Sequence, residues 1–447
     1  MARGDRFAST IIEKAVLVGV FLPDRHYGNP PLAELEGLAE AAGTKVVGKL
    51  TQRRDAPDAA TYLGSGKVKE LKELVQATGA DVVIFDNDLS PAQTRNLENA
   101  LQVKVLDRTE LILDIFATRA RTHEARIAVE LAQLEYSMPR LKRMWTHLSR
   151  LRKGVGLRGP GEKQLEEDRR LVEKRINDLR AELATIERRK QREVASRHPW
   201  ITVSLVGYTN TGKSTLLNRL TGANVFVHDG LFATLDTRTR KWPIPGWGTV
   251  LLSDTVGFIR DLPYHLVASF RATLEEAREA HLLLHIADAA SPDALDQIRA
   301  AYKVLEEIGI QQKNSILVLN KVDLLTDSSR LEHLQELFPG AIPISARTGV
   351  GLDRLESAVR EALRRLRVEL HVELGIHNGR LLAFLTAQGE VISRQFRNKV
   401  MEVHCRISPE HIGTIQRWGG QILRREEPPQ DVWENTAAVA DEPTWQS

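Results

Sequence analysis

The feature that most constrains the fold is a glycine-rich loop placed directly between an aliphatic run and a helical segment. The apolar run 201–206 is followed at once by Gly207, Tyr208, Thr209, Asn210, Thr211, Gly212, Lys213 and Ser214, and a helical segment continues from Thr215. This G-x-x-x-x-G-K-S spacing lets backbone amide groups at a helix N-terminus point at an anion. In that setting Lys213 reaches the β- and γ-phosphates, and the Ser214 hydroxyl is a ligand for Mg²⁺. The loop therefore predicts an α/β sheet with a nucleotide site where this strand ends.

A second motif follows the apolar run 251–253. It consists of Asp254, Thr255, Val256 and Gly257. A carboxylate at the end of a strand can hold the magnesium ion through a water, and the glycine amide can meet a γ-phosphate. We therefore assign Asp254 to the metal and Gly257 to the γ-phosphate.

Two further motifs after apolar runs indicate the base. The run 317–319 leads into Asn320, Lys321, Val322 and Asp323, and the run 342–344 leads into Ser345, Ala346 and Arg347. A carboxylate at Asp323 accepts two hydrogen bonds from the N1–H and N2–H₂ edge of guanine, a donor pair that adenine lacks. The loop at Ser345–Arg347 can present a backbone N–H to the base. Together with the phosphate loop, these motifs predict a GTPase domain that hydrolyses GTP to GDP and phosphate.

The segment between the first two motifs is the expected switch, and it consists of Phe232, Ala233, Thr234, Leu235 and Asp236. Thr234 can add its hydroxyl to the Mg²⁺ and its amide to the γ-phosphate, becoming ordered only with GTP. Thr237 and Thr239 are weaker candidates for that role. We expect Lys213, Thr234 and Gly257 to act on the transferred phosphoryl group. The residue after Gly257 is Phe258, where many regulatory GTPases have a water-orienting glutamine. Slow intrinsic hydrolysis that a partner accelerates is therefore expected, unless another residue of the chain orients the water.

The first 120 residues alternate short apolar runs with helical segments. We expect strands at 15–20, 46–50, 81–85 and 103–105, separated by helices at 31–42, 67–76 and 94–101. Strands that are apolar on both faces and separated by helices are typical of a parallel sheet. The segment Gly64-Ser65-Gly66-Lys67 opens a helix and leaves open a second phosphate or adenine-nucleotide site, although a polar turn with a helix cap explains it equally well.

Between residues 121 and 198 the apolar positions recur at alternating spacings of four and three. Such a seam predicts two helical arms of a coiled-coil type, and the glycines of 154–161 forbid one continuous helix. Pro139 predicts a kink or break in the first arm. Residues 140–198 carry 18 Lys+Arg against 9 Asp+Glu, a net charge of +9, whereas the rest of the chain carries −6. The basic residues that bracket the glycine-rich tip are candidates for binding phosphate-rich RNA: Arg150, Arg152, Lys153, Arg158 and Lys163.

These observations predict an α/β protein with five parts: an N-terminal α/β domain (1–120), a basic antiparallel helical hairpin (121–198), a P-loop GTPase domain (199–367), a small C-terminal α/β domain (368–425) and an acidic disordered tail (426–447). The single cysteine, Cys405, excludes an intramolecular disulfide scaffold. Because no apolar run is long enough to span a bilayer and no signal peptide is visible, we expect a soluble cytoplasmic protein without membrane insertion.

The motifs also carry a family resemblance. The order of the nucleotide motifs resembles the translation-factor-related GTPases, and two segments are similar to the HflX family of its Obg–HflX-like branch: Gly154–Arg170 and Tyr62–Lys67. The resemblance covers roughly residues 15–365. It implies a GTPase that binds the large (50S) ribosomal subunit through the hairpin and N-terminal domain, as a monomer off the ribosome. The implied roles are ribosome splitting, rescue or recycling under stress, and ribosome biogenesis.

Some alternatives remain open at this stage. In similar GTPases an asparagine at the position of Asn210 ligates a K⁺ ion beside the phosphates, but asparagine also suits a loop for conformational reasons alone. The expected ligands are thus GTP or GDP with Mg²⁺, and K⁺ is a candidate. The rival functions are a signalling GTPase that acts on protein partners and an ATP-dependent RNA remodeller that uses the N-terminal domain. The sequence does not say which trigger acts on the protein or what residues 368–447 do.

Overall fold

The computed structural model describes residues 12–23, 30–150, 160–196, 200–223, 231–232, 237–245, 247–260, 276–307, 309–310, 315–365, 367–397, 399–408 and 411–426. The chain forms two compact units. The first contains the N-terminal domain and most of the hairpin, together with two short stretches from later in the sequence that include Phe232 and Arg260. The second contains the remaining parts of the GTPase domain and the C-terminal domain.

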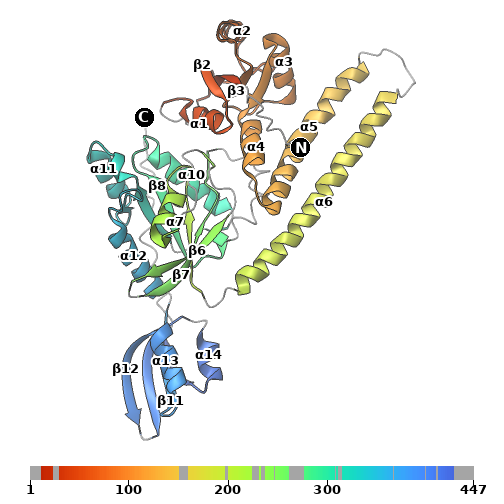
Figure 1. The fold of residues 1–447 in the computed structure, drawn as a ribbon. Coiled ribbons are helices and arrows are strands. Elements are labelled where there is room, and N and C mark those ends of the chain that lie inside the picture. Colours follow the sequence, from red (N-terminus) through yellow and green to blue (C-terminus); the bar gives the residue numbers. More distant parts are fainter. Residues whose placement is uncertain are drawn as a thin grey trace, which may run out of the picture. The chain divides into compact units, whose positions relative to one another are not determined.

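The N-terminal domain is a parallel four-stranded sheet in the order β2-β1-β3-β4, with helices between the strands (Figure 1). Its elements are β1 (Lys14–Phe21), α1 (Ala33–Ala41), β2 (Lys45–Arg53), α2 (Ser65–Thr78), β3 (Val82–Phe85), α3 (Pro91–Leu101), β4 (Lys104–Asp107) and α4 (Arg108–Arg119). Aliphatic side chains from β1 and β3, such as Val16, Val18 and Val83, form the buried core. The predicted alternation of strands and helices is confirmed.

The hairpin consists of α5 (His123–Arg150) and α6 (Pro160–Ser196), two long helices that run side by side in Figure 1. Their apolar seam is buried and includes Ile127, Leu131, Ile176, Leu179 and Leu183. Exposed ion pairs flank the seam: Arg175 binds Glu130 through two hydrogen bonds of 2.8 and 2.9 Å, and Arg180 lies 2.6 Å from Glu135. The antiparallel hairpin predicted from the spacing is confirmed.

Of the kink or break expected at Pro139, the break is wrong, because α5 is continuous from His123 to Arg150; the kink stays a prediction. A proline inside a helix removes one backbone hydrogen bond and crowds the carbonyl four residues earlier. Around this position the apolar seam continues, with Leu134 and Met138 packed against the buried residues of the hairpin. We attribute the continuity of α5 to this packing.

The GTPase domain contains a six-stranded sheet in the order β10-β9-β8-β5-β7-β6, in which only the β6–β7 pair is antiparallel. Its elements are β5 (Thr202–Val206), α7 (Lys213–Thr221), β6 (Arg238–Ile244), β7 (Gly248–Asp254), β8 (Leu282–Asp288), α10 (Ala294–Glu307), β9 (Ser315–Asn320), the 3₁₀ helix η1 (Val322–Leu324), α11 (Ser329–Leu337), β10 (Ile342–Pro343) and α12 (Leu352–Arg364). The four sequence motifs follow β5, β7, β9 and β10, so they meet at the carboxyl edge of the sheet, where open α/β sheets bind ligands.

The C-terminal domain has the order β11 (Val368–Gly375), α13 (Gly379–Gln388), β12 (Glu390–Arg397), β13 (Val400–Ile407), α14 (Ile412–Arg417) and β14 (Gln421–Glu426). These strands form an antiparallel sheet in the order β12-β13-β11-β14, which is a βαββαβ arrangement. Residues of both helices pack on one face of the sheet, and Cys405 is buried there. The predicted small α/β domain is present, although α14 and β14 carried no signal that we identified. Residues 427–447 lie outside the described ranges. None of the described helices combines the length and apolarity that crossing a bilayer requires.

Candidate nucleotide site

The loop between β5 and α7 is shaped for close backbone approach. Gly207 has a φ of +140°, and a Cβ atom there would lie 2.2 Å from the carbonyl oxygen of Ile286. Gly212 has a φ of +90°, and a Cβ atom there would lie 2.4 Å from Nδ2 of Asn320. Only glycine is compatible with both the conformation and the space at these two positions. Asn210, with a φ of +57°, is exposed at the outer turn of the loop.

Lys213 begins α7 and is almost completely buried, with 6% of its surface exposed. Its Nζ atom donates hydrogen bonds to the carbonyl oxygens of Gly207 at 3.0 Å and Tyr208 at 2.6 Å. Burial lowers the pKa of the Lys213 ammonium to about 8; the nearby charge of Lys321 also lowers it, and the carboxylate of Asp254 opposes this change. The loop thus holds a cation inside a cradle of carbonyl groups, at the point where the sequence predicts a phosphate.

The two predicted metal ligands of the described site lie side by side. The Ser214 hydroxyl donates a hydrogen bond of 2.6 Å to Oδ2 of Asp254, whose side chain is fully buried at the end of β7. Nearby, the buried Thr209 hydroxyl has no hydrogen-bond partner within the described chain. Adjacent hydroxyl and carboxylate oxygens are the hard ligands that Mg²⁺ prefers, and a phosphate oxygen is a suitable partner for a buried hydroxyl. These residues therefore fit a magnesium–nucleotide complex.

The segment after Asp254 closes against the phosphate loop. The Phe258 amide donates to the Gly207 carbonyl at 3.0 Å, and the Phe258 carbonyl accepts from the Thr209 amide at 2.7 Å. A Cβ atom on Gly257 would lie 2.8 Å from Cα of Thr209 and 3.1 Å from Nζ of Lys213. The structure thus brings Gly257 next to Lys213, as the sequence predicts. Phe258 is buried and contributes no polar side-chain group.

The base-binding motifs are joined by Asn320. Its Nδ2 donates to the Thr211 carbonyl at 2.7 Å, and its Oδ1 accepts from the Ala346 amide at 2.9 Å. Asn320 therefore ties the phosphate loop to the Ser345–Arg347 loop. Asp323 lies on η1 and is exposed, as a residue that accepts hydrogen bonds from a base must be.

Two contacts in the base region involve residues that we did not single out from the sequence. Lys321 has a φ of +65°, and its Nζ atom lies 2.8 Å from Oδ2 of Asp288 at the end of β8. Arg219 on α7 donates to the Thr348 carbonyl at 3.3 Å and so reaches the loop that begins at Ser345. Asp288 ends β8, whose residues 282–287 are apolar except for His285, and it occupies a strand end like the other motifs, so the same spacing argument would have identified it.

Only part of the predicted switch segment lies within the described residues. Phe232 is described and buried, but Ala233, Thr234, Leu235 and Asp236 lie outside the described residues. The roles assigned to Thr234 therefore stay predictions. Thr239, a weaker candidate, donates its hydroxyl to Oε2 of Glu276 at 3.0 Å.

Of the candidate RNA-binding residues, the structure describes the backbone of Arg150 and Lys163. Arg150 ends α5 and Lys163 lies in the first turn of α6, but their side chains are not described. Arg152, Lys153 and Arg158 lie in the undescribed connection between the helices.

The second glycine-rich segment, at Gly64, forms a helix cap. Gly64 precedes α2, and its amide donates to Oε1 of Gln52 at 3.0 Å. Lys67 pairs with Glu70 in the next turn. These contacts match the polar turn that we considered from the sequence, and the question of a second nucleotide in residues 1–120 stays a prediction.

Comparison with known proteins agrees with this geometry. Residues 29–117 match the family described as GTP-binding GTPase N-terminal, residues 119–197 match GTP-binding GTPase Middle Region, and residues 202–321 match 50S ribosome-binding GTPase. The chain is 48% identical to the GTPase HflX of Escherichia coli (strain K12) over 373 residues, which cover 83% of this chain and 87% of that protein. It is 42% identical to the GTPase HflX of Lacrimispora saccharolytica over 407 residues, which cover 91% of this chain and 96% of the relative.

Among solved structures, the chain is similar to a GTP-binding protein from the hyperthermophilic archaeon Sulfolobus solfataricus in complex with GDP. The sequence identity is 25%, the TM-score is 0.43, and the match covers 79% of this chain and 100% of that one.

Proposed function

The chain belongs to the HflX family of GTPases, and we propose that it uses GTP to control binding of its basic hairpin to RNA of the large ribosomal subunit. The nucleotide activity follows from the family and from the loop geometry: the chain binds GTP and hydrolyses it to GDP and phosphate. The ribosomal target is the proposal. It is supported by the description of the family that matches residues 202–321, which is a 50S ribosome-binding GTPase.

The observation that carries the proposal is the position of the positive charge. The net charge of +9 over residues 140–198 belongs to the segment that forms the two-helix hairpin, and several of its basic residues stand next to the glycine-rich connection in the sequence. The phosphate backbone of RNA attracts such a positively charged segment strongly. We propose that the protein acts as a cytoplasmic monomer in splitting, rescue or recycling of ribosomes, or in their assembly.

In the proposed hydrolysis a water attacks the γ-phosphorus, and the bond to the oxygen that bridges the β- and γ-phosphates breaks. Lys213 would leave the carbonyl groups of Gly207 and Tyr208 and bind β- and γ-phosphate oxygens. The Gly257 amide would bind the γ-phosphate. The hydroxyls of Ser214 and Thr234 would bind Mg²⁺ directly, and Asp254 would bind it through a water. Bound Mg²⁺ neutralises charge on the phosphate oxygens.

Nothing at Phe258 can orient the attacking water, because its side chain is apolar and buried. We therefore propose that hydrolysis is slow in the isolated protein and that contact with the ribosomal subunit accelerates it. A K⁺ ion on Asn210 is a second proposed source of positive charge. The exposed position of Asn210 at the edge of the loop leaves its side chain accessible to an ion.

The test is sedimentation with large ribosomal subunits in the presence of a non-hydrolysable GTP analogue, GDP or no nucleotide. We expect binding with the analogue, weaker binding with GDP, and a steep loss of binding as salt rises. A variant with Arg150, Arg152, Lys153 and Arg158 replaced by glutamine should lose most of the binding. Equal binding in all nucleotide states would refute the proposal.

A matched control removes the same amount of charge elsewhere. Arg397, Lys399, Arg424 and Arg425 lie in the C-terminal domain, and their replacement by glutamine should leave most of the binding intact. If both variants lose binding equally, the hairpin is not the RNA-binding element. Binding to a protein target without salt dependence would favour the signalling function.

A further inference from the structure

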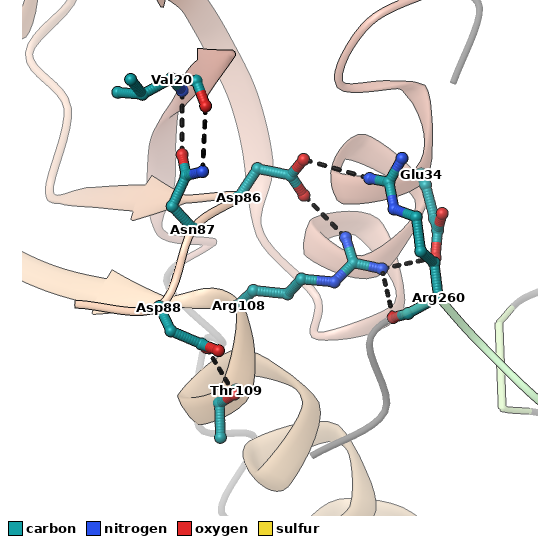
Figure 2. A network of polar contacts seen from close by, with 8 residues as sticks. All are labelled: Val20, Glu34, Asp86, Asn87, Asp88, Arg108, Thr109 and Arg260. Carbon is teal, nitrogen blue, oxygen red and sulfur yellow. Dashed lines mark hydrogen bonds and ion pairs between the residues drawn. The ribbon is translucent and has the colours of Figure 1, made fainter. Parts of the chain in front are cut away.

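One polar cluster of the first compact unit includes a residue from the GTPase part of the sequence. Figure 2 shows Arg108 and Arg260 converging on the carboxylate of Asp86. Arg108 Nη1 lies 2.7 Å from Oδ1 of Asp86, and Arg260 Nη2 lies 3.2 Å from Oδ2 of the same side chain. Arg108 also donates to Glu34 at 2.5 Å and to the backbone carbonyl of Arg260 at 3.2 Å. Arg260 is thus held through both its side chain and its main chain.

The carboxylate that receives Arg260 is rigidly placed. Asp86 follows β3, and the next residue, Asn87, bonds both backbone groups of Val20 on β1, at 2.9 and 3.0 Å. Asp88 accepts the Thr109 hydroxyl at 2.7 Å (Figure 2). Asp86 and Arg108 are 7% and 3% exposed. Breaking such a buried ion pair leaves an uncompensated charge and costs free energy, so the pair holds Asp86 in place.

Arg260 lies three residues after Gly257, the residue predicted to bind the γ-phosphate. The boundary between the two compact units falls between Phe258 and Ile259, so the chain passes from the nucleotide site to this anchor within a few residues. Three residues span at most about 10 Å when extended. An anchored Arg260 therefore limits how far Gly257 and Phe258 can move from Asp86.

Helix α4 links this anchor to the hairpin. Arg108 is the first residue of α4, and the cap residue before it, Asp107, accepts a hydrogen bond from the hydroxyl of Tyr136 on α5. Further along α4, Phe116 packs edge-on against Phe232, with ring centroids 4.4 Å apart. Phe232 is two residues before Thr234. The segments of Thr234 and Gly257 are both predicted to contact the γ-phosphate. Each is thus held to α4 by a residue two or three positions away, and α4 also contacts the hairpin.

We propose that Asp86, Arg108 and Arg260 form a latch that restrains the Gly257–Phe258 segment, and that α4 transmits its movement to the base of the hairpin. Asp86 and Arg260 are positioning residues, because they act on hydrolysis through Gly257. With the latch closed, Phe258 stays bonded to Gly207 and hydrolysis is slow. Release of the latch lets Gly257 meet the γ-phosphate. One step, in which docking of the hairpin on RNA opens the latch, rests on the function proposed above.

The test is single-turnover GTP hydrolysis by the full chain without ribosomes, so that it does not depend on the RNA target. Arg260→Gln is the first variant. The Arg260 side chain is 24% exposed, and its removal leaves Asp86 paired with Arg108. We expect the hydrolysis rate to rise by at least about threefold, because a charge-assisted contact that restrains the loop is lost. Affinity for GDP should be unchanged, and Arg260→Lys should restore the slow rate.

A second variant tests whether Arg260 acts through Asp86. Asp86→Asn should raise the rate to the same extent, and the double variant should add nothing further. The matched control, Arg364→Gln, removes an exposed arginine near Glu361 on α12 and should leave the rate unchanged. An unchanged or reduced rate in folded Arg260→Gln protein, or additive effects in the double variant, would overturn the latch.

Amide hydrogen exchange tests the link through α4. In the wild-type chain, exchange in α4 and the first turns of α5 should differ between a GTP analogue and GDP, and Arg260→Gln should abolish that difference. If exchange there does not respond to the nucleotide in the wild type, α4 does not transmit the change. The function on ribosomes could still hold in that case, since the sedimentation experiment measures it separately.

Discussion

Replacement of Asp323 by asparagine should change the preferred base from guanine to xanthine. Asp323 is exposed on η1, and the local fold does not depend on its side chain. The turn is fixed by backbone groups: the Val322 amide donates to the Ile344 carbonyl at 3.2 Å, and the Leu324 amide donates to the Lys321 carbonyl at 3.0 Å. The substitution therefore removes ligand contacts and leaves the site in place.

The size of the effect follows from the bonds that the carboxylate makes to guanine. A hydrogen bond to a charged group contributes about 1.5–3 kcal/mol, so loss of two such bonds costs about 3–6 kcal/mol. The affinity for guanine nucleotides should fall by about 10²–10⁴-fold. Xanthine has a carbonyl at position 2 in place of the amino group, and an asparagine amide can donate to that carbonyl while accepting from N1–H. Xanthosine nucleotides should therefore bind the variant more tightly than guanosine nucleotides do.

Titration calorimetry with the diphosphates measures this directly, because diphosphates are not hydrolysed. Asp327→Asn is the matched control: Asp327 is also an exposed aspartate near η1, and it bonds Ser329 at the start of α11. This control should keep the wild-type affinities for both bases. Retention of guanosine affinity within about threefold in the Asp323 variant would show that the base is recognised elsewhere.

Three further predictions concern single residues. Burial and the charge of Lys213 lower the pKa of His285 to about 3, so the unfolded chain binds more protons than the folded chain below about pH 6.5. The free energy of unfolding should therefore fall by about 2 kcal/mol between about pH 8 and pH 5. Denaturant titrations should show that His285→Leu loses this pH dependence. GTP turnover should be about tenfold faster in KCl than in NaCl, and Asn210→Ala should remove the difference. Asp288→Asn should weaken GDP binding by about threefold, because it releases Lys321, while the hydrolysis rate at saturating GTP stays unchanged.

The nucleotide site was predictable because its residues obey local rules. Each motif follows an apolar strand, and parallel strands place their carboxyl ends at one edge. From this rule alone, Lys213, Asp254 and Asn320 were expected to lie near one another, and the structure places them so. The hairpin was predictable for the same kind of reason, since a seam such as Ile127–Leu131 repeats along the helix.

The latch was not predictable, because its residues lack any periodic relation. Asp86 and Arg260 are 174 positions apart, and nothing local to either residue indicates the other. A buried charge is informative only once its burial is known, and burial is a tertiary property. Pro139 shows the opposite error: a local rule allowed a break of the helix, and α5 nevertheless continues where the apolar seam packs.

The N-terminal domain and the GTPase domain use the same edge of an α/β sheet, the carboxyl edge, for different purposes. In the GTPase domain the carboxyl edge carries the phosphate loop and its metal ligands. In the N-terminal domain the carboxyl ends of β3 and β4 carry Asp86 and Arg108, and there they bind Arg260 from the chain itself. A sheet edge suited to holding a ligand thus holds a segment that continues directly from the γ-phosphate motif. In the latch proposed above, the segment bound at this edge is the GTPase segment itself, so a change of nucleotide reaches the hairpin through Arg260 and α4.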